Sequence, residues 1–355
     1  PKYIVKENGE VGSRNGVNTG SIETKMGIKG SPTCALNFDN AQGYMIGPEN
    51  KGLNSMFTMM NLERIIVGIQ GLGIAETAYQ NALAYSKERK QGKANNSKNK
   101  DADFIIKHAD IRRSLMNMKS LIEGQRSLAF WVSQQIDVSL NHKDPKIKQT
   151  ANDLVSMMTP LIKSFFTDTG MEITNDAIQV FGGYGYTKDQ GIEQLFRDNR
   201  ITPIYEGTNS VQAIDLVYRK ILNNKIFDKY ISQITNEIRE YDKITELTLF
   251  VQKFQKYIEL LNNFTSWIGE KNKNSKDDVS AACNDYLKVL GYISLAHSWL
   301  KILKVSYEKL NTNKSFYEDK INTGKYYFDK ILPRAQSHYL SAVTGSESMM
   351  KADFN

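Results

Sequence analysis

Hydrophobic residues change their spacing near residue 52. Before that point the pattern is typical of strands and turns: "KYIVK" leads into the turn "ENGE", and Cys34, Leu36 and Phe38 alternate in "CALNFDN". After it, apolar residues recur at helical spacing almost to the end of the chain. The sequence therefore predicts a mainly α protein with a small β segment at its start.

The helical pattern divides at polar segments and at glycine. It predicts a long helix from Gly52 to about Lys90, a loop over "KQGKANNSKNKDAD", and then helices over residues 104–141, 147–169, 174–181 and from about Glu206 to Ile221. The fourth of these would carry Asn175 and Asp176 in its first turn. Helices with such short links favour an antiparallel bundle. Three glycines inside the first helix lower its propensity, and we expect a neighbouring helix or a ligand to approach there: Gly68, Gly71 and Gly73.

The chain stays helical after Asn224. Further helices are predicted around residues 231–261, 279–310 and 315–343, with the polar segment "GEKNKNSKDD" as a linker. No Gly-x-Gly-x-x-Gly opens a βα unit, so a dinucleotide-binding Rossmann domain is not supported.

Composition excludes several classes of protein. No apolar run reaches the length of a membrane span, and the start "PKYIVKENGE" lacks the pattern of a signal peptide, so we expect a cytoplasmic protein without membrane insertion. The two cysteines lie far apart and the four histidines have no ligand spacing, which argues against a metal site. A net charge of +7 is mild for 355 residues and decides nothing by itself.

One carboxylate stands in a chemically suggestive segment. Glu206 lies in "PIYEGTNSVQ", after the glycine run "FGGYGY" and after Arg197 and Arg200. A glutamate at a helix start often serves only to stabilise the helix dipole. A base beside backbone amides and anion-binding groups, however, is what removal of a proton from carbon requires, because the developing enolate must be stabilised.

These segments resemble a known family. "QVFGGYGY" followed by "FRDNRITPIYEGTNSVQ" is similar to the C-terminal signature of the acyl-CoA dehydrogenases, and "MMNLERIIVGIQGLGIAETAYQNALAYSKERKQG" is similar to their earlier bundle helices. The amino-acid sequence of these segments and the helical tail look most like the larger branch of the family, which includes the 3-methylmercaptopropionyl-CoA dehydrogenases and long-chain relatives. The resemblance implies three domains: the end of a middle β-domain at 1–48, an FAD- and acyl-CoA-binding helical bundle at 49–222, and a helical C-terminal extension at 223–355.

The resemblance also implies roles for individual residues. Glu206 corresponds to the catalytic base, and its backbone N–H and Gly207 lie where the thioester binds. Arg64, in "NLERI", matches a substrate-orienting position, and Arg89, in "YSKERKQG", matches an arginine that reaches the FAD of a neighbouring subunit. Other positions match the cofactor site: Gln179, Gly182, Gly183, Tyr205 and Thr208.

The expected cofactor is FAD and the expected substrate an acyl-CoA. Relatives are dimers or tetramers and pass electrons to an electron-transferring flavoprotein, so we expect the same partners here. The chain begins with Pro1 inside a strand pattern, and the family's N-terminal helical domain has no counterpart in it. We therefore expect a chain truncated at its N-terminus, with uncertain activity of its own.

Two alternatives remain open. Alkylation-response flavoproteins share the expected fold but bind DNA through a basic C-terminal region. Residues 223–355 contain 19 Lys and Arg against 16 Asp and Glu without a cluster in the sequence, so we do not expect a nucleic-acid partner. The chain could also be an inactive assembly fragment.

Overall fold

Four short strands occupy the start of the chain in a computed structural model that describes residues 1–222 and 226–354. They pair antiparallel as two separate two-stranded sheets, β1 (Tyr3–Val5) with β2 (Val11–Arg14) and β3 (Val17–Ile22) with β4 (Cys34–Phe38). The predicted β segment is confirmed. These strands belong to a compact unit of their own, Pro1–Asn61, and the rest of the chain forms the second unit, Leu62–Asn355.

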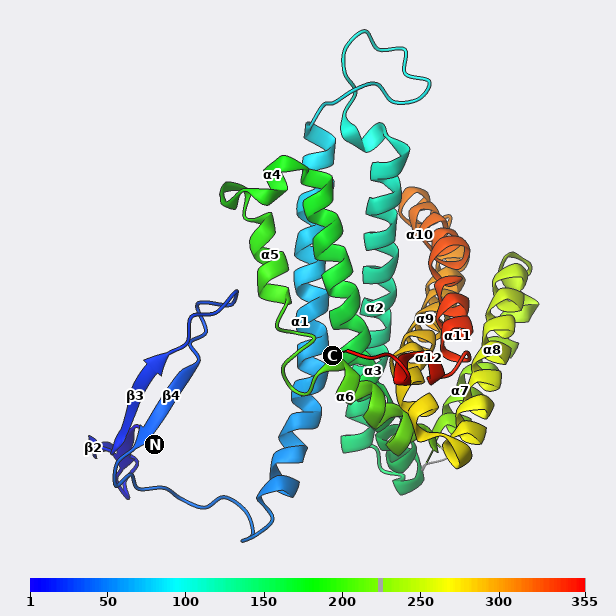
Figure 1. The fold of residues 1–355 in the computed structure, drawn as a ribbon. Coiled ribbons are helices and arrows are strands. Elements are labelled where there is room, and N and C mark those ends of the chain that lie inside the picture. Colours follow the sequence, from blue (N-terminus) through cyan, green and yellow to red (C-terminus); the bar gives the residue numbers. More distant parts are fainter. Residues whose placement is uncertain (223–225, 355) are drawn as a thin grey trace. The chain divides into compact units, whose positions relative to one another are not determined.

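Three long helices follow the strands: α1 (Gly52–Glu88), of which residues 62–88 belong to the second unit, α2 (Ala109–Asn141) and α3 (Pro145–Phe181) (Figure 1). The irregular segment between α1 and α2 ends in the short η1 (Ile105–Lys107). The start of α3 is specified locally, because Asp144 Oδ1 accepts a hydrogen bond from Lys146 N at 2.8 Å and Pro145 occupies the first helical position. The predicted antiparallel bundle is confirmed for this part of the chain.

The third helix is longer than predicted. Residues 147–169 and 174–181 belong to one continuous helix, so Asn175 and Asp176 lie in its interior and the prediction of a new first turn there was wrong. Gly170 marks a packing contact and not a helix end: a Cβ atom added to it would lie 3.1 Å from the carbonyl oxygen of Gly71 on α1. The hydroxyl of Thr174 donates to the Gly170 carbonyl at 3.0 Å, within the same helix.

Short elements connect the bundle to the tail. They are α4 (Gly183–Tyr186), η2 (Lys188–Gln190), α5 (Ile192–Asn199), α6 (Asn209–Ile214) and the π-helical η3 (Asp215–Leu222). Helix α5 was predicted as a loop. The sequence "IEQLFRDN" is too short to show a clear period, but an ion pair between Glu193 and Arg197 one turn apart supports the helix.

The described part of the tail consists of helices joined by short turns: α7 (Ile226–Arg239), η4 (Tyr241–Lys243), η5 (Thr245–Leu247), α8 (Thr248–Asn274), α9 (Lys276–Glu308), α10 (Lys314–Tyr326), η6 (Tyr327–Ile331), α11 (Arg334–Ala342) and α12 (Glu347–Met350). The predicted polar linker is mostly helical, since only Ser275 separates α8 from α9. Ser275 caps α9 by accepting a hydrogen bond from Asp278 N at 3.3 Å.

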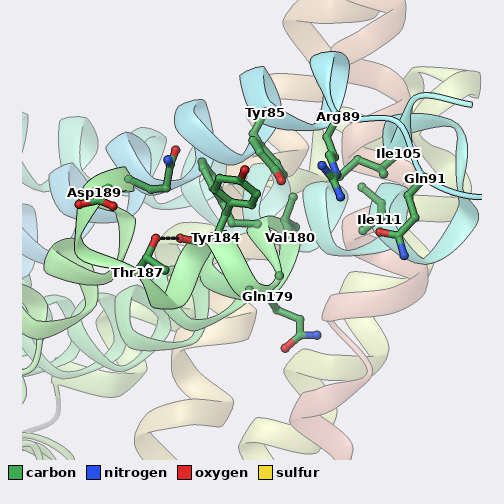
Figure 2. Close-up of a pocket in the computed structure, with 14 residues that line it drawn as sticks. Tyr85, Arg89, Gln91, Ile105, Ile111, Gln179, Val180, Tyr184, Thr187 and Asp189 are labelled. Atoms are coloured by element: carbon green, nitrogen blue, oxygen red, sulfur yellow. Dashed lines mark hydrogen bonds between the residues drawn. The ribbon is translucent and has the colours of Figure 1, made fainter.

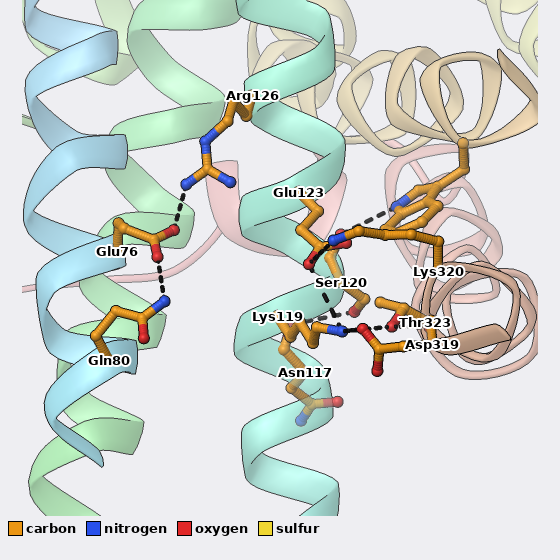
Figure 3. Close-up of polar contacts among 11 residues, drawn as sticks. Glu76, Gln80, Asn117, Lys119, Ser120, Glu123, Arg126, Asp319, Lys320 and Thr323 are labelled. Carbon is orange, nitrogen blue, oxygen red and sulfur yellow. Dashed lines mark hydrogen bonds and ion pairs between the residues drawn. The ribbon is translucent and has the colours of Figure 1, made fainter. Parts of the chain in front are cut away.

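The tail is packed firmly on the bundle through α9, which contacts α2, α3, α8, α10 and α11. Trp299 of α9 is fully buried, and its ring N–H donates to the Ser120 carbonyl of α2 at 3.0 Å. Polar contacts also join α2 to α10 (Figure 3): Lys119 pairs with Asp319, and Lys320 with Glu123 at 2.7 Å. No helix in the described part of the chain is long and apolar enough to cross a membrane.

Two of the three glycines in α1 lie against α3. A Cβ atom added to Gly68 would lie 2.6 Å from Ile162 Cγ2, and one added to Gly71 would lie 3.2 Å from Thr167 Cα. The prediction of close approach is confirmed for these two. No helix approaches Gly73, which has nothing within 4 Å of that position.

We expect Gly68→Ala to destabilise the protein by about 1–3 kcal/mol, because the added methyl group meets the backbone of α3. Gly73→Ala is the matched control in the same helix and is expected to stabilise by about 0.5–1 kcal/mol. Urea unfolding monitored by circular dichroism measures both. Equal stability of the two variants would contradict the assigned helix contact.

Candidate active site

The segment with Glu206 forms a tight turn between α5 and α6. Glu206 has a backbone φ of 57° and Gly207 one of 84°, so two successive residues adopt the left-handed region. This conformation is costly for a glutamate and persists only where the surroundings impose it. Thr208 ends the turn and caps α6, since its hydroxyl accepts a hydrogen bond from Val211 N at 3.4 Å.

Side chains from three helices hold the carbonyl groups of this turn. The Glu206 carbonyl accepts from Gln212 Nε2 at 3.0 Å and from Arg64 Nε at 3.3 Å. The Gly207 carbonyl accepts from Lys163 Nζ at 2.8 Å. No acceptor for the backbone N–H of Glu206 is recorded among residues 1–222 and 226–354. The carbonyls of the turn are thus bound by protein side chains, and the backbone N–H of Glu206 can donate a hydrogen bond to another molecule.

Lys163 is the strongest of these anchors. Its side chain is fully buried, and its ammonium also donates to Asn209 Oδ1 at 2.9 Å. Desolvation lowers its pKa to about 8, although Asp168 and Glu206 favour the charged form. Asn209 in turn donates to Asp168 Oδ1 at 2.6 Å. Burial is the main cause that raises the pKa of Asp168.

Tyr205 extends the site toward α1. It is half-buried, and its hydroxyl donates to Gln70 Oε1. Desolvation is the main cause that raises the pKa of this phenol. The structure therefore brings together five of the predicted site residues: Arg64, Tyr205, Glu206, Gly207 and Thr208.

The other predicted residues line a separate cavity of about 580 Å³ (Figure 2). Arg89 comes from the end of α1, and Gln179, Gly182 and Gly183 from the junction of α3 and α4. Gly182 has a φ of 61°, and neither glycine has any atom within 4 Å of where a Cβ would stand. The backbone is thus open to a ligand here, as phosphate binding requires.

Aromatic rings form one wall of this cavity. Tyr85 stacks on Phe181 with ring centroids 4.2 Å apart, and Tyr184 lies 6.5 Å from Tyr85. These rings were not among the predicted site residues, because a bare aromatic is more often part of a core.

The two groups of residues are far apart on one chain. Arg64 lies in α1 and Arg89 directly follows the end of that helix, and 25 residues at 1.5 Å per residue separate them by about 37 Å. A single extended dinucleotide is shorter than this distance. The two groups therefore cannot hold one cofactor molecule together within one chain.

Some expectations for this region were wrong. Gly185, in the glycine run "FGGYGY" that was expected to permit close backbone approach to a ligand, packs instead against α3: a Cβ added there would lie 2.5 Å from the Ile178 carbonyl oxygen. Arg197 was expected to bind anions, but its guanidinium is bound to Glu193 at 3.0 Å. Lys163 and Gln70 were missed. The lysine inside the apolar run "MMTPLIKSFF" was the available signal for the first.

Comparison with known proteins agrees with this architecture. Residues 50–222 match the model of the acyl-CoA dehydrogenase C-terminal domain, and residues 230–353 match an acetyl-CoA dehydrogenase C-terminal-like model. The chain belongs to the acyl-CoA dehydrogenase family. It is 41% identical over 224 residues to 3-methylmercaptopropionyl-CoA dehydrogenase of Ruegeria pomeroyi, covering 63% of this chain and 38% of that protein.

Two further relatives extend the match along the chain. Butyryl-CoA dehydrogenase of Syntrophomonas wolfei is 31% identical over 369 residues, which cover 99% of this chain and 59% of the relative. The structure of Caenorhabditis elegans ACDH-11 in complex with C11-CoA has the same fold, with a TM-score of 0.76 and 19% identity over 99% of this chain and 60% of that one. The chain thus spans between about two fifths and three fifths of the length of these relatives.

We expect Lys163→Met to loosen the turn. The substitution leaves the Gly207 carbonyl without its donor and removes the shorter of two hydrogen bonds to Asn209 Oδ1, and an unsatisfied buried acceptor costs about 1–3 kcal/mol. Hydrogen exchange measured by mass spectrometry should show faster exchange of the peptide containing residues 205–209. Unchanged exchange of this peptide would contradict the anchoring role.

The pH dependence of the same variant checks the burial of the ammonium. Because the pKa of Lys163 is lowered from 10.5 to about 8, the unfolded chain holds more protons than the folded one between these values. The unfolding free energy of the wild type should therefore rise relative to that of Lys163→Met as pH increases through this window. A flat or falling difference would argue against a desolvated ammonium.

Proposed function

We propose that this chain carries the catalytic base of an FAD-dependent acyl-CoA dehydrogenase. We also propose that the residues around Glu206 and those that line the cavity at Arg89 both contact FAD. The observation that carries the proposal is the turn at Glu206. This half-buried residue has a strained backbone, the carbonyls of Glu206 and Gly207 accept hydrogen bonds, and the backbone N–H of Glu206 has no acceptor among the described residues. Family membership supports this assignment. We also propose the domain boundaries 1–48, 49–222 and 223–355 on the same basis.

The chemistry follows from these groups. The Glu206 carboxylate takes the proton from the α-carbon of the acyl-CoA thioester, and its backbone N–H donates a hydrogen bond to the thioester carbonyl oxygen, where negative charge develops. FAD, when bound, supplies the acceptor for the hydride that leaves the β-carbon, so that a double bond forms between the two carbons. Arg64 holds the carbonyl of Glu206 and thereby orients both groups.

The residues of the cavity at Arg89 fit part of FAD. The open backbone at Gly182 and Gly183 suits phosphate oxygens, Arg89 supplies a positive charge, and the rings of Tyr85 and Tyr184 suit a flat base. A cavity of about 580 Å³ lies in the usual range for a bound cofactor fragment.

We infer that each cofactor site is shared between two copies of the chain. The separation of about 37 Å between Arg64 and Arg89 supports this arrangement, because one chain alone cannot bring its two groups to one FAD. Each site then combines Glu206, Tyr205 and Thr208 of one protomer with Arg89, Gln179, Gly182 and Gly183 of another. We propose an electron-transferring flavoprotein as the electron acceptor, as in the family.

We expect Glu206→Gln to slow the reaction strongly without loss of cofactor binding. The 355-residue chain is mixed with FAD, made anaerobic, and treated with saturated acyl-CoAs including butyryl-CoA and 3-methylmercaptopropionyl-CoA. The rate of flavin bleaching should fall by about 10²–10⁴ in the variant, since the proton acceptor is gone.

Glu76→Gln is the control for this experiment. Glu76 lies on α1, pairs with Arg126, and is 12 residues from Arg64, so its loss should leave bleaching unchanged. Equal rates in Glu206→Gln and the wild type would refute the assigned base. Absence of bleaching in the wild type with every acyl-CoA would refute activity of this chain.

Complementation tests the shared site. Arg89→Glu and Glu206→Gln chains, each inactive alone, are mixed, unfolded and refolded together. In randomly formed dimers, the mixed dimer has one site with both native residues, so roughly a quarter of the wild-type bleaching should return. No recovery, with mixed dimers verified by mass spectrometry, would place both residues at one site within a chain.

A further inference from the structure

A second cavity lies at the seam between the bundle and the tail. It has a volume of about 520 Å³ and is formed by the start of α2 on one side and by α10, η6 and α11 on the other. Asn117 stands at its edge and accepts a hydrogen bond from the hydroxyl of Tyr326 at 2.7 Å. The same hydroxyl is 3.2 Å from the Arg113 carbonyl oxygen. These bonds hold α2 and α10 together on one side of the cavity.

The lining of this cavity is strongly basic. Arg112 and Arg113 come from α2, Lys330 from η6 and Arg334 from α11, and no carboxylate is among the lining residues. Arg334 is bound to Glu172 at 2.6 Å. The other three have no recorded ion pair within residues 1–222 and 226–354.

A bound anion would stabilise such a cluster. Like charges that share one cavity repel each other, and solvent screens this repulsion only in part, although Arg112, Arg113 and Lys330 are exposed. Glu172 and Asp176 of α3 compensate only part of the charge: burial raises the pKa of Asp176, while Arg113 and Arg334 act on it in the opposite direction. A bound anion would remove the remaining repulsion.

The chemistry of the lining favours phosphate. Two adjacent guanidinium groups offer planar pairs of donors that match phosphate oxygens. Ala109, the first residue of α2, also lines the cavity, and the preceding His108 makes no side-chain capping bond, so the positive end of the helix dipole faces the same region. Met116 and the ring of Tyr326 form an apolar part of the lining, which the remainder of a ligand can contact.

This site is distinct from the cavity at Arg89. Ile111 lines the cavity at Arg89, whereas Arg112 and Arg113 line the cavity at the seam. Successive residues of a helix point about 100° apart, so the two cavities lie on different faces of α2. A ligand in one therefore does not occupy the other.

We propose that the cavity lined by Arg112, Arg113, Lys330 and Arg334 binds a small molecule carrying a pyrophosphate or comparable phosphate group. The ligand would contact α2 of the bundle and α11 of the tail at once. Its binding would therefore stabilise the docking of the tail in addition to any role of the ligand itself.

Methyl NMR of the full 355-residue chain, labelled at the methionine methyl groups, tests the proposal at the site itself. Met116 lines the cavity, and its signal is assigned with the Met116→Leu variant. Titration with inorganic pyrophosphate at low salt should shift this signal in a saturable manner. Titration with ADP shows the source of the phosphate: tighter binding than pyrophosphate indicates a nucleotide, and equal binding indicates that the phosphates alone are recognised.

Two double variants show whether the basic residues of this cavity are responsible for the binding of pyrophosphate. Arg112→Gln combined with Arg113→Gln should weaken the binding by about tenfold or more, since it removes two charge-assisted contacts. Arg239→Gln combined with Lys256→Gln removes the same charge from exposed positions on α7 and α8 and should leave the binding unchanged.

Three results would overturn the proposal. One is the absence of a saturable Met116 shift with both pyrophosphate and ADP. Another is equal weakening by the two double variants, which would indicate only a general attraction of anions. The third is binding of a DNA duplex that depends on Arg112 and Arg113 while neither small anion shifts Met116, which would favour a nucleic-acid surface at this seam.

Discussion

The hydrogen bond from the buried ammonium of Lys163 to the Gly207 carbonyl is the interaction on which the candidate site depends. It holds a turn in which Glu206 adopts a backbone conformation that an unconstrained glutamate avoids. The same ammonium binds Asn209 at the start of α6, so the turn and the following helix share one anchor. Burial of a charged group lowers stability unless the charge is well bonded. Because the hydrogen bonds of Lys163 go to the turn, the stability of the bundle and the geometry of the Glu206 carboxylate depend on the same contacts.

The close contact of α1 with α3 allows this arrangement. Gly68 and Gly71 on one helix and Gly170 on the other let the backbones approach, and Arg64 and Gln70 of α1 then reach the turn at Glu206 and Tyr205. The same two helices continue to the far end of the bundle, where Arg89 and the end of α3 line the cavity proposed for the cofactor. Rigid helices thus fix the distance between two half-sites and make a second copy of the chain necessary in our proposal.

Much of the fold was predictable from the sequence, and the failures have physical causes. The long helices of the bundle follow from apolar periodicity, and the chain's membership of the family from the segments around Arg64, Gly182 and Glu206. The predicted break between residues 169 and 174 was wrong, because helix propensity alone cannot show that Gly170 serves helix packing. Lys163 was missed because its partners are separated from it by 44 or more residues. The basic cavity was hidden for a similar reason, since a count over residues 223–355 omits Arg112 and Arg113 of α2.

The central claim is that Glu206 removes the proton from the α-carbon of an acyl-CoA. Exchange of that proton in D₂O, followed by mass spectrometry of butyryl-CoA incubated with the FAD-supplemented chain, measures this step without the need for an electron acceptor. The account predicts deuterium at the α-carbon with the wild type and none above background with Glu206→Gln. Equal incorporation with both proteins would contradict it.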